Sequence, residues 1–189
     1  MTSLAIASPN DDDPTPVEDL LITDFGAGLS DLGWYVVNDG VMGGLSEGGF
    51  ELRPGELLFT GKTNTNGGGF SSIRTMPVAL NLSDFEGIRL KILGDGRRYT
   101  WQLTTNAMWR GRPVSFWAEF DTRDEEWDII DIPFSRFEPR FRGRVLDGPA
   151  LDPGRITGLG LMINDGKDGA FAASLASVGA YATQVPSSR

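Results

Sequence analysis

Cysteine and histidine are both absent from this chain of 189 residues. Without cysteine there is no disulfide framework, no thiolate nucleophile and no cysteine metal site. Without histidine the Ser-His-Asp and Cys-His catalytic systems are excluded, together with almost all zinc sites. The missing cysteine fits a reducing compartment, although many exported proteins also lack it.

Lysine is scarce as well: the 17 basic residues comprise 14 Arg and only three Lys. Arginine forms planar, bidentate hydrogen bonds, so this bias favours ion-pair networks or anion recognition. The net charge of −9 has nothing of the basic footprint of a nucleic-acid binder, and we predict no nucleic-acid partner. No apolar run approaches the ~18 residues of a membrane-spanning helix, so we also predict no transmembrane segment.

The two ends differ from the rest of the chain in composition. Residues 1–18 are acidic and rich in proline, which predicts a disordered acidic leader. They lack the basic start of a signal peptide and the arginines of a transit peptide, and a remnant of a processed targeting segment is the alternative. The length suits one domain, which we place at 19–183, followed by a flexible tail at 184–189.

Alternating apolar and polar residues recur between turn signals, with almost no helical periodicity. The expected strands are 20–25, 50–53, 56–61, 70–75, 88–92, 99–103, 114–120, 127–130, 156–163 and 171–182. Residues 135–154 are expected to be irregular. This pattern is typical of an all-β sandwich or barrel, with the last strand near the first.

Two glycine-containing segments partly match motifs of enzymes, a nucleophile elbow and a dinucleotide-binding site, but neither segment meets the full requirements of its motif. Gly44–Gly48 matches G-x-S-x-G, but a nucleophile elbow needs a strand-to-helix turn and a base, so we interpret Ser46 as part of a polar turn. Gly26–Asp31 lacks the third glycine and the following helix of a dinucleotide site. We therefore predict no cofactor.

The tripeptide Asn38-Asp39-Gly40 recurs as Asn164-Asp165-Gly166. Such tripeptides are hairpin signals, because Asn, Asp and Gly tolerate positive φ. The alternative is two loops at one rim that offer amides and carboxylates to a ligand. Together with Asp24 the aspartates could supply oxygen to Ca²⁺, but no EF-hand spacing supports this, and we predict no metal.

Paired carboxylates are the remaining route to catalysis. Glu119 with Asp121, and Glu125, Glu126 and Asp128, lie on or near expected strands, and glycosidases place two carboxyls roughly 5–10 Å apart. Acidic residues around a hairpin are more often a solvated face. We predict no catalytic residue.

Nine basic residues, all arginine, lie in the stretches 97–112 and 136–155. Ion pairing with the many acids is one interpretation. The other is a docking surface for an acidic partner or an anionic-ligand site, since arginine and aromatic residues are enriched at interface hot spots. If exposed, Trp109 and Trp117 would favour protein binding or sugar stacking.

Two glycine-rich segments carry a family resemblance. Val37-Asn38-Asp39-Gly40-Val41-Met42-Gly43-Gly44-Leu45-Ser46, after Trp34, and Asn66-Gly67-Gly68-Gly69-Phe70-Ser71-Ser72-Ile73-Arg74 closely resemble the complex I intermediate-associated protein family. Its members are NADH:ubiquinone oxidoreductase assembly factors and their bacterial relatives. Stretches at 94–99, at 133–137 followed by 141–144, and at 156–171 resemble it too, so the likeness runs collinearly over about 20–182.

The resemblance implies a galactose-binding-domain-like β-sandwich, a jelly roll, and a non-catalytic role. Mitochondrial members act as chaperones for intermediates of complex I assembly. The implied partners are respiratory complex I subunits or assembly intermediates. The absence of an evident transit segment suggests a bacterial, cytoplasmic member; a eukaryotic member would act in the mitochondrial matrix. The residues expected to bind, taken from the matching segments, are Asn38, Asp39, Met42, Gly43, Gly44, Asn66, Arg74, Asp95, Arg97, Tyr99, Phe141 and Arg142.

Related sandwiches bind carbohydrates, which gives the alternative function. A carbohydrate-binding module would stack sugar on Trp101, Trp109 or Trp117 and bind hydroxyls with polar side chains. A carboxylate-based enzyme is the third hypothesis. It requires two acids facing one cleft, one of them with a raised pKa.

Overall fold

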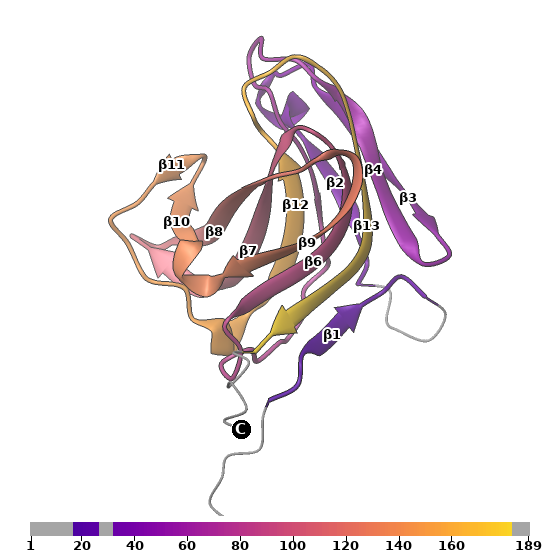
Figure 1. Ribbon diagram of the computed structural model, residues 1–189. Helices are drawn as coiled ribbons and strands as arrows, with labels where there is room; N and C mark the ends of the chain where they lie inside the picture. Colours follow the sequence, from indigo (N-terminus) through magenta and orange to yellow (C-terminus); the bar gives the residue numbers. More distant parts are fainter. Residues whose placement is uncertain (1–16, 27–31, 183–189) are drawn as a thin grey trace, which may run out of the picture.

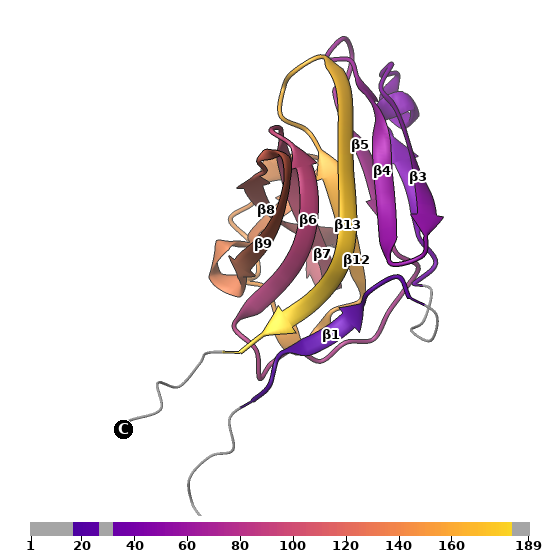
Figure 2. The ribbon, with the colours of Figure 1, turned by 45° about the vertical axis from the view of Figure 1, so that its right-hand side comes forward.

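A computed structural model describes residues 17–26 and 32–182 of the protein. It contains two antiparallel β-sheets packed face to face (Figures 1 and 2). The strands are β1 (Leu20–Thr23), β2 (Tyr35–Asn38), β3 (Glu47–Arg53), β4 (Glu56–Thr63), β5 (Ser71–Arg74), β6 (Gly87–Asp95), β7 (Arg98–Trp109), β8 (Arg112–Asp121), β9 (Asp124–Pro133), β10 (Glu138–Phe141), β11 (Arg144–Val145), β12 (Gly158–Ile163) and β13 (Gly169–Tyr181). Short 3-10 helices occur at η1 (Asp39–Met42), η2 (Phe134–Arg136) and η3 (Pro153–Arg155).

One sheet has six strands in the order β3-β4-β13-β6-β9, with β1 pairing to β13. The other has seven strands in the order β11-β10-β8-β7-β12-β5-β2. The pairing of β1 with β13 confirms that the last expected strand lies beside the first (Figure 2). The two sheets confirm the predicted all-β sandwich.

The core forms around strands that alternate apolar and polar residues, of which β7 is the central example. Tyr99, Trp101 and Leu103 of β7 have no exposed surface and face the six-stranded sheet, where Ile88 and Leu90 of β6 are equally buried. The residues between them on β7 are polar and lie on the outer face of the seven-stranded sheet. Because of this alternation, polar side chains line the outer face of the seven-stranded sheet, and the candidate site lies on that face.

Two strand regions differ from the sequence-based expectation. The prediction that 135–154 is irregular is wrong in part, because β10 pairs with β8 and with β11 at the sheet edge. The short strand β2 was not expected from the sequence, because it lies next to a glycine-rich segment. It forms by pairing with β5. Apart from residues 17 and 18, the expected leader and tail lie outside the described residues. No helix in the described ranges is long and apolar enough to cross a bilayer.

We expect the contact between the two aromatic rings of Phe59 and Phe171, whose centroids are 4.8 Å apart, to be important for stability. Phe59 has no exposed surface, so Phe59→Ala should lower the free energy of unfolding by about 3–5 kcal/mol in urea denaturation. Leu52→Ala on the neighbouring strand is the control; its side chain is 47% exposed, and the change should stay within about 0.5 kcal/mol. Equal effects of the two substitutions would contradict this account of the core.

Candidate functional site

The glycine-dense block folds around the carboxylate of Asp39, which has no exposed surface. Its Oδ1 accepts a hydrogen bond from the Ser46 amide at 2.9 Å. Its Oδ2 accepts from the amides of Gly69 at 2.6 Å and Phe70 at 3.2 Å. Burial opposes the charged form of Asp39, but these hydrogen bonds outweigh it and lower the pKa of the carboxyl. Asp39 therefore joins the two glycine-rich segments.

Glycines make room for this carboxylate. A Cβ on Gly44 would lie 2.2 Å from Asp39 Cγ, and one on Gly68 would lie 2.4 Å from Oδ2. Asn38 fixes the same region from the next position, since its Oδ1 accepts from the Ser71 hydroxyl at 2.6 Å. The glycines expected to shape tight loops here do so because a backbone must approach a buried side chain.

A second cluster forms around Arg97, whose guanidinium pairs with Asp165 at 2.6 and 2.9 Å. The two side chains are only 11% and 3% exposed. Arg97 also donates to Thr63 Oγ1 at 3.0 Å and to the carbonyls of Lys167 and Ala170. Burial raises the pKa of Asp165, but Arg97 outweighs it and the net direction is downward. The second Asn-Asp-Gly tripeptide thus supplies a buried ion pair.

Tyr99 and Asp95 complete this cluster. The Tyr99 hydroxyl donates to Asp95 at 3.1 Å, and the Ala172 amide donates to Asp95 Oδ2 at 2.8 Å. Burial, and then the negative charge of Asp95, raise the pKa of Tyr99. The polar groups of these two residues are directed at the protein itself.

The residues that resemblance marks for binding therefore divide into three sets. Asn38, Asp39, Gly44, Asp95, Arg97 and Tyr99 are bonded or packed within the two clusters. Gly43 ends η1 with φ of 86°, Asn66 is exposed nearby, and the side chain of Met42 lies outside the described part. Arg74, Phe141 and Arg142 lie on two surfaces that present arginines without a carboxylate partner among the described residues.

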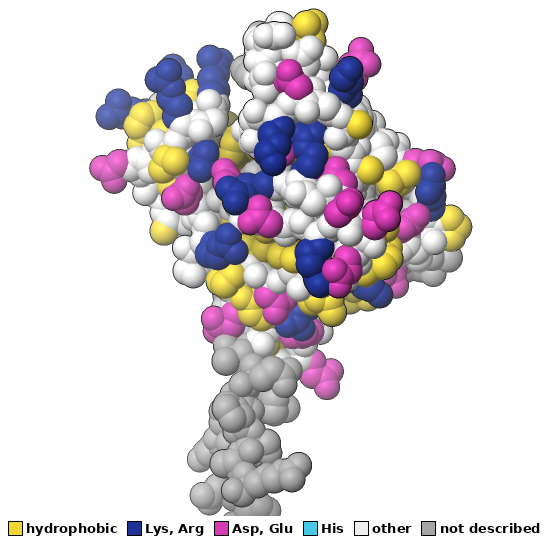
Figure 3. Space-filling model, turned by 45° about the horizontal axis from the view of Figure 1, so that its top comes forward, with side chains coloured by type: hydrophobic (Ala, Val, Ile, Leu, Met, Phe, Trp, Pro, Cys, Tyr) yellow, Lys and Arg dark blue, Asp and Glu magenta, His cyan; other side chains and the backbone are white. Residues whose placement is uncertain are grey.

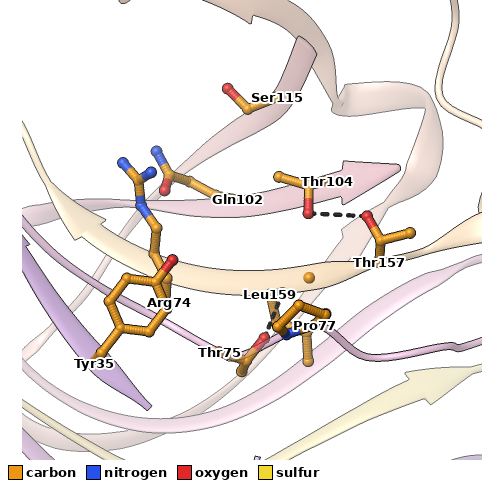
Figure 4. A pocket seen from close by; sticks show the side chains of 10 residues that line it. Tyr35, Arg74, Thr75, Pro77, Gln102, Thr104, Ser115, Thr157 and Leu159 are labelled. Atoms are coloured by element: carbon orange, nitrogen blue, oxygen red, sulfur yellow. Dashed lines mark hydrogen bonds between the residues drawn. The ribbon is translucent and has the colours of Figure 1, made fainter. Parts of the chain in front are cut away.

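Arg74 lies in a groove on the outer face of the seven-stranded sheet (Figure 4). The groove has a volume of about 300 Å³. Cross-strand pairing places Tyr35 beside Arg74, and Gly160 separates Arg74 from Gln102. Figure 4 shows these three side chains at one end and the hydrogen-bonded hydroxyls of Thr104 and Thr157 at the other.

The row across the sheet continues to Trp117 of β8, which pairs with Gln102. The Trp117 ring is half-buried, and the Arg140 guanidinium lies 5.3 Å from its centroid. Tyr35 at the other end of the row is 42% exposed. Trp101 faces the core with no exposed surface, which corrects its assignment as a sugar-stacking residue.

Two hairpins share the pattern aromatic-Arg-Gly-Arg: Trp109–Arg112 between β7 and β8, and Phe141–Arg144 between β10 and β11. In each turn both central residues have positive φ, with 49° at Arg110 and 50° at Arg142. Positive φ at both positions defines a type I′ turn. We call Arg110, Arg112, Arg142 and Arg144 the arginine patch.

The four arginines of the patch are all exposed. Arg110 lies 4.4 Å from the Trp109 ring centroid, while Arg112 and Arg142 lie 5.2 and 5.5 Å from that of Phe141. Among the described residues, none of the four is paired with a carboxylate. Figure 3 shows Lys and Arg side chains over hydrophobic ones at its upper left, the side of β10 and β11 in Figure 1.

The carboxylates proposed for catalysis face arginines instead of one another. Asp121 pairs with Arg98 at 2.8 Å, and Asp128 pairs with Arg123. In both cases the arginine lowers the pKa of the acid, whereas a general acid needs a raised one. Asp24, Asp39 and Asp165 are not brought together; in the described ranges no group of three or more acids is placed to hold a metal.

Comparison with protein families identifies the family of this chain. The family model described as Complex I intermediate-associated protein 30 (CIA30) matches residues 23–175. The chain belongs to this family. A Drosophila melanogaster CIA30 protein, named as mitochondrial, is 30% identical over 171 residues, covering 77% of this chain and 57% of its own length.

A second relative is an uncharacterised protein of Schizosaccharomyces pombe. It is 31% identical over 120 residues, covering 56% of this chain and 53% of the relative. The chain thus spans slightly more than half the length of these two curated relatives. The match in sequence confirms the family resemblance drawn from the glycine segments.

Solved structures confirm the galactose-binding-domain-like jelly roll. The family 11 carbohydrate-binding module of a Clostridium thermocellum cellulase superposes with a TM-score of 0.65 at 18% identity, covering 92% of this chain and all of that one. A family 30 carbohydrate-binding module gives a TM-score of 0.55 at 12% identity, covering 90% and 91%. At these identities the likeness extends to the fold alone.

We expect Asp39→Asn to destabilise the protein by about 1–3 kcal/mol at neutral pH, because an amide nitrogen or a weaker acceptor would then face amide donors. Since folding lowers the pKa of Asp39, the stabilisation that its carboxylate gives the fold is complete above the unfolded pKa of about 3.9 and is lost as pH falls through the folded pKa. The difference in unfolding free energy between wild type and variant should therefore shrink towards pH ~2–3.

Urea denaturation at several pH values measures this difference. Asp84→Asn, at an exposed aspartate, is the matched control and should stay within about 0.5 kcal/mol of wild type. A gap between wild type and Asp39→Asn that stays constant with pH would contradict the assigned role.

Proposed function

We propose that this CIA30 member is a non-catalytic binding module that assists complex I assembly. It docks an acidic surface of a complex I subunit or assembly intermediate through the arginine patch. The observation that carries the proposal is the pair of hairpins that present unpaired arginines at strained turn positions. The family and the name of the Drosophila relative support the choice of partner.

The backbone of these turns argues for a role beyond folding. A left-handed conformation costs most L-residues about 1–2 kcal/mol, and Asn or Gly would occupy these positions at lower cost. Arg110 and Arg142 hold such conformations in both turns. A charged tip is thus maintained where a neutral residue would make a more stable hairpin.

The surroundings of the patch suit a charged interface. The chain as a whole carries −9, so a local excess of positive charge contrasts with the rest of the molecule. Three of the four guanidinium groups lie near aromatic rings, which limits their freedom before binding. Exposed Met108 and Val145 add apolar area beside the two turns. Arginine with adjacent aromatic residues is the composition of interface hot spots.

The proposed site of action is the compartment in which complex I intermediates are exposed. This is the cytoplasm for a bacterial member, reached at the membrane through the partner, and the mitochondrial matrix for a eukaryotic one. The binding roles of the remaining rim residues, Asn66 and Gly43 among them, stay predictions under this proposal.

Pull-down from detergent-solubilised respiratory membranes tests the docking proposal. The wild type should recover complex I subunits, and the double variant Arg110→Asn with Arg142→Asn should recover about tenfold less. The melting temperature should stay equal or rise, because Asn adopts positive φ more readily. Recovery that is unchanged in the double variant would overturn the role of the patch.

Glu125→Asn is a matched control, because Glu125 also has a positive φ of 54°, near the start of β9. It relaxes a comparable backbone position without altering the patch, so recovery should equal that of wild type. Recovery by the wild type should also fall with added salt, since exposed charges are screened.

Carbohydrate binding in the groove is the second candidate function. The observation that favours it is the row of Tyr35, Gln102 and Trp117, which combines aromatic faces with an amide donor. One of the structural neighbours was solved with a β-1,3-1,4-mixed-linked tetrasaccharide, and it shares the fold with a TM-score of 0.62. A glycan array tests this candidate function. Tyr35→Ala should weaken any binding signal, and an array on which the wild type binds no glycan would exclude carbohydrate binding.

A further inference from the structure

The groove on the seven-stranded sheet contains a positive charge that nothing in the described structure neutralises. Arg74 has no carboxylate partner among the described residues, and its Nε is enclosed without a hydrogen bond. The other arginines in the described ranges that are not fully exposed are Arg89, Arg97 and Arg140, and each is paired with an acid. Burial lowers the pKa of Arg74, which reflects the cost of keeping this charge out of water.

Glycines keep the space around Arg74 open. A Cβ on Gly160 would lie 3.2 Å from Gln102 Oε1 and 3.4 Å from Arg74 Cγ, and one on Gly158 would lie 2.6 Å from Thr104 Oγ1. The groove of about 300 Å³ is at the lower end of the range for small-molecule sites. The space therefore suits a compact ligand.

Neutral donors and acceptors line the rest of the groove. They are the amide of Gln102 and the hydroxyls of Tyr35, Thr75, Thr104, Ser115 and Thr157. Arg74 is the only cation among the lining residues, and none of them is acidic. A ligand with one negative charge would neutralise the groove, whereas a phosphate dianion would leave an excess of negative charge.

We propose that the groove binds a hydroxylated monocarboxylate the size of one sugar acid. Its carboxylate accepts hydrogen bonds from the Arg74 guanidinium, which matches carboxylate geometry. Its hydroxyls bond to Gln102 and to the threonine hydroxyls at the other end (Figure 4). The proposal rests on the second candidate function only in that the groove receives a ligand, and it is independent of the arginine patch.

The stability of Arg74 variants provides a readout that distinguishes binding from folding. A desolvated charge without a partner destabilises the folded protein, so Arg74→Gln should keep or raise the melting temperature. A residue whose role is structural would lower it. Arg74→Lys retains the charge but loses the planar pair of donors, and it should bind more weakly than wild type.

Titration of the full chain with glucuronate, glucose and inorganic phosphate, followed by calorimetry or amide chemical shifts, tests the proposal. Glucuronate should bind at least tenfold more tightly than glucose or phosphate. Arg74→Gln should lose at least tenfold of the glucuronate affinity and none of any glucose affinity. Arg53→Gln is the control, because Arg53 is an exposed arginine paired with Glu51, and it should bind as wild type does.

The outcomes separate the hypotheses. Equal binding of glucose and glucuronate, or glucuronate binding unchanged in Arg74→Gln, would overturn the acidic ligand while leaving carbohydrate binding intact. Tighter binding of phosphate than of glucuronate would overturn the monocarboxylate. No binding of any of the three would overturn the inference, and a glycan array would then decide the second candidate by itself.

Discussion

The buried ion pair between Arg97 and Asp165 joins two connections that each pass from one sheet to the other, the link from β6 to β7 and the link from β12 to β13. Arg97 follows the turn after β6, Asp165 lies between β12 and β13, and the same guanidinium reaches Thr63 at the end of β4. Such a pair stabilises only when its remaining donors are also satisfied, and here the carbonyls at 167, 169 and 170 accept them. The ends of three strands are thereby fixed at one edge of the sandwich.

Asp39 is a buried negative charge that also needs hydrogen-bonding partners, and backbone amides donate to its carboxylate. These two clusters absorb most of the polar residues that family resemblance marks for binding. Among the cations of the described residues that have no carboxylate partner, Arg74 in its groove and the arginine patch on its hairpins carry the proposals. Charged groups with hydrogen-bonding partners inside the protein therefore support the fold, whereas the arginines without such partners mark the candidate binding surfaces.

The fold was largely predictable because alternation and turn signals identified most strands. The prediction of strands failed where pairing with another strand decides the structure. The strands β2 and β10 have four residues each, and each depends on a neighbour far away in the sequence. The candidate site was less predictable. Asp39 and Arg97 look like ligand-binding residues in sequence, but their partners come from distant segments. The repeated aromatic-Arg-Gly-Arg pattern was readable in the sequence, and its two copies could have been compared.

The position of β13 has a consequence for how the chain acquires its structure during synthesis. This strand lies at the centre of the six-stranded sheet and joins β4, β6 and β1, although it is the last of the described strands. Before it emerges from the ribosome, β3–β4 and β6–β9 are pairs that share no sheet. The nascent protein therefore exposes apolar strand faces until residues 169–181 are available, and its folding is coupled to the end of translation of this segment.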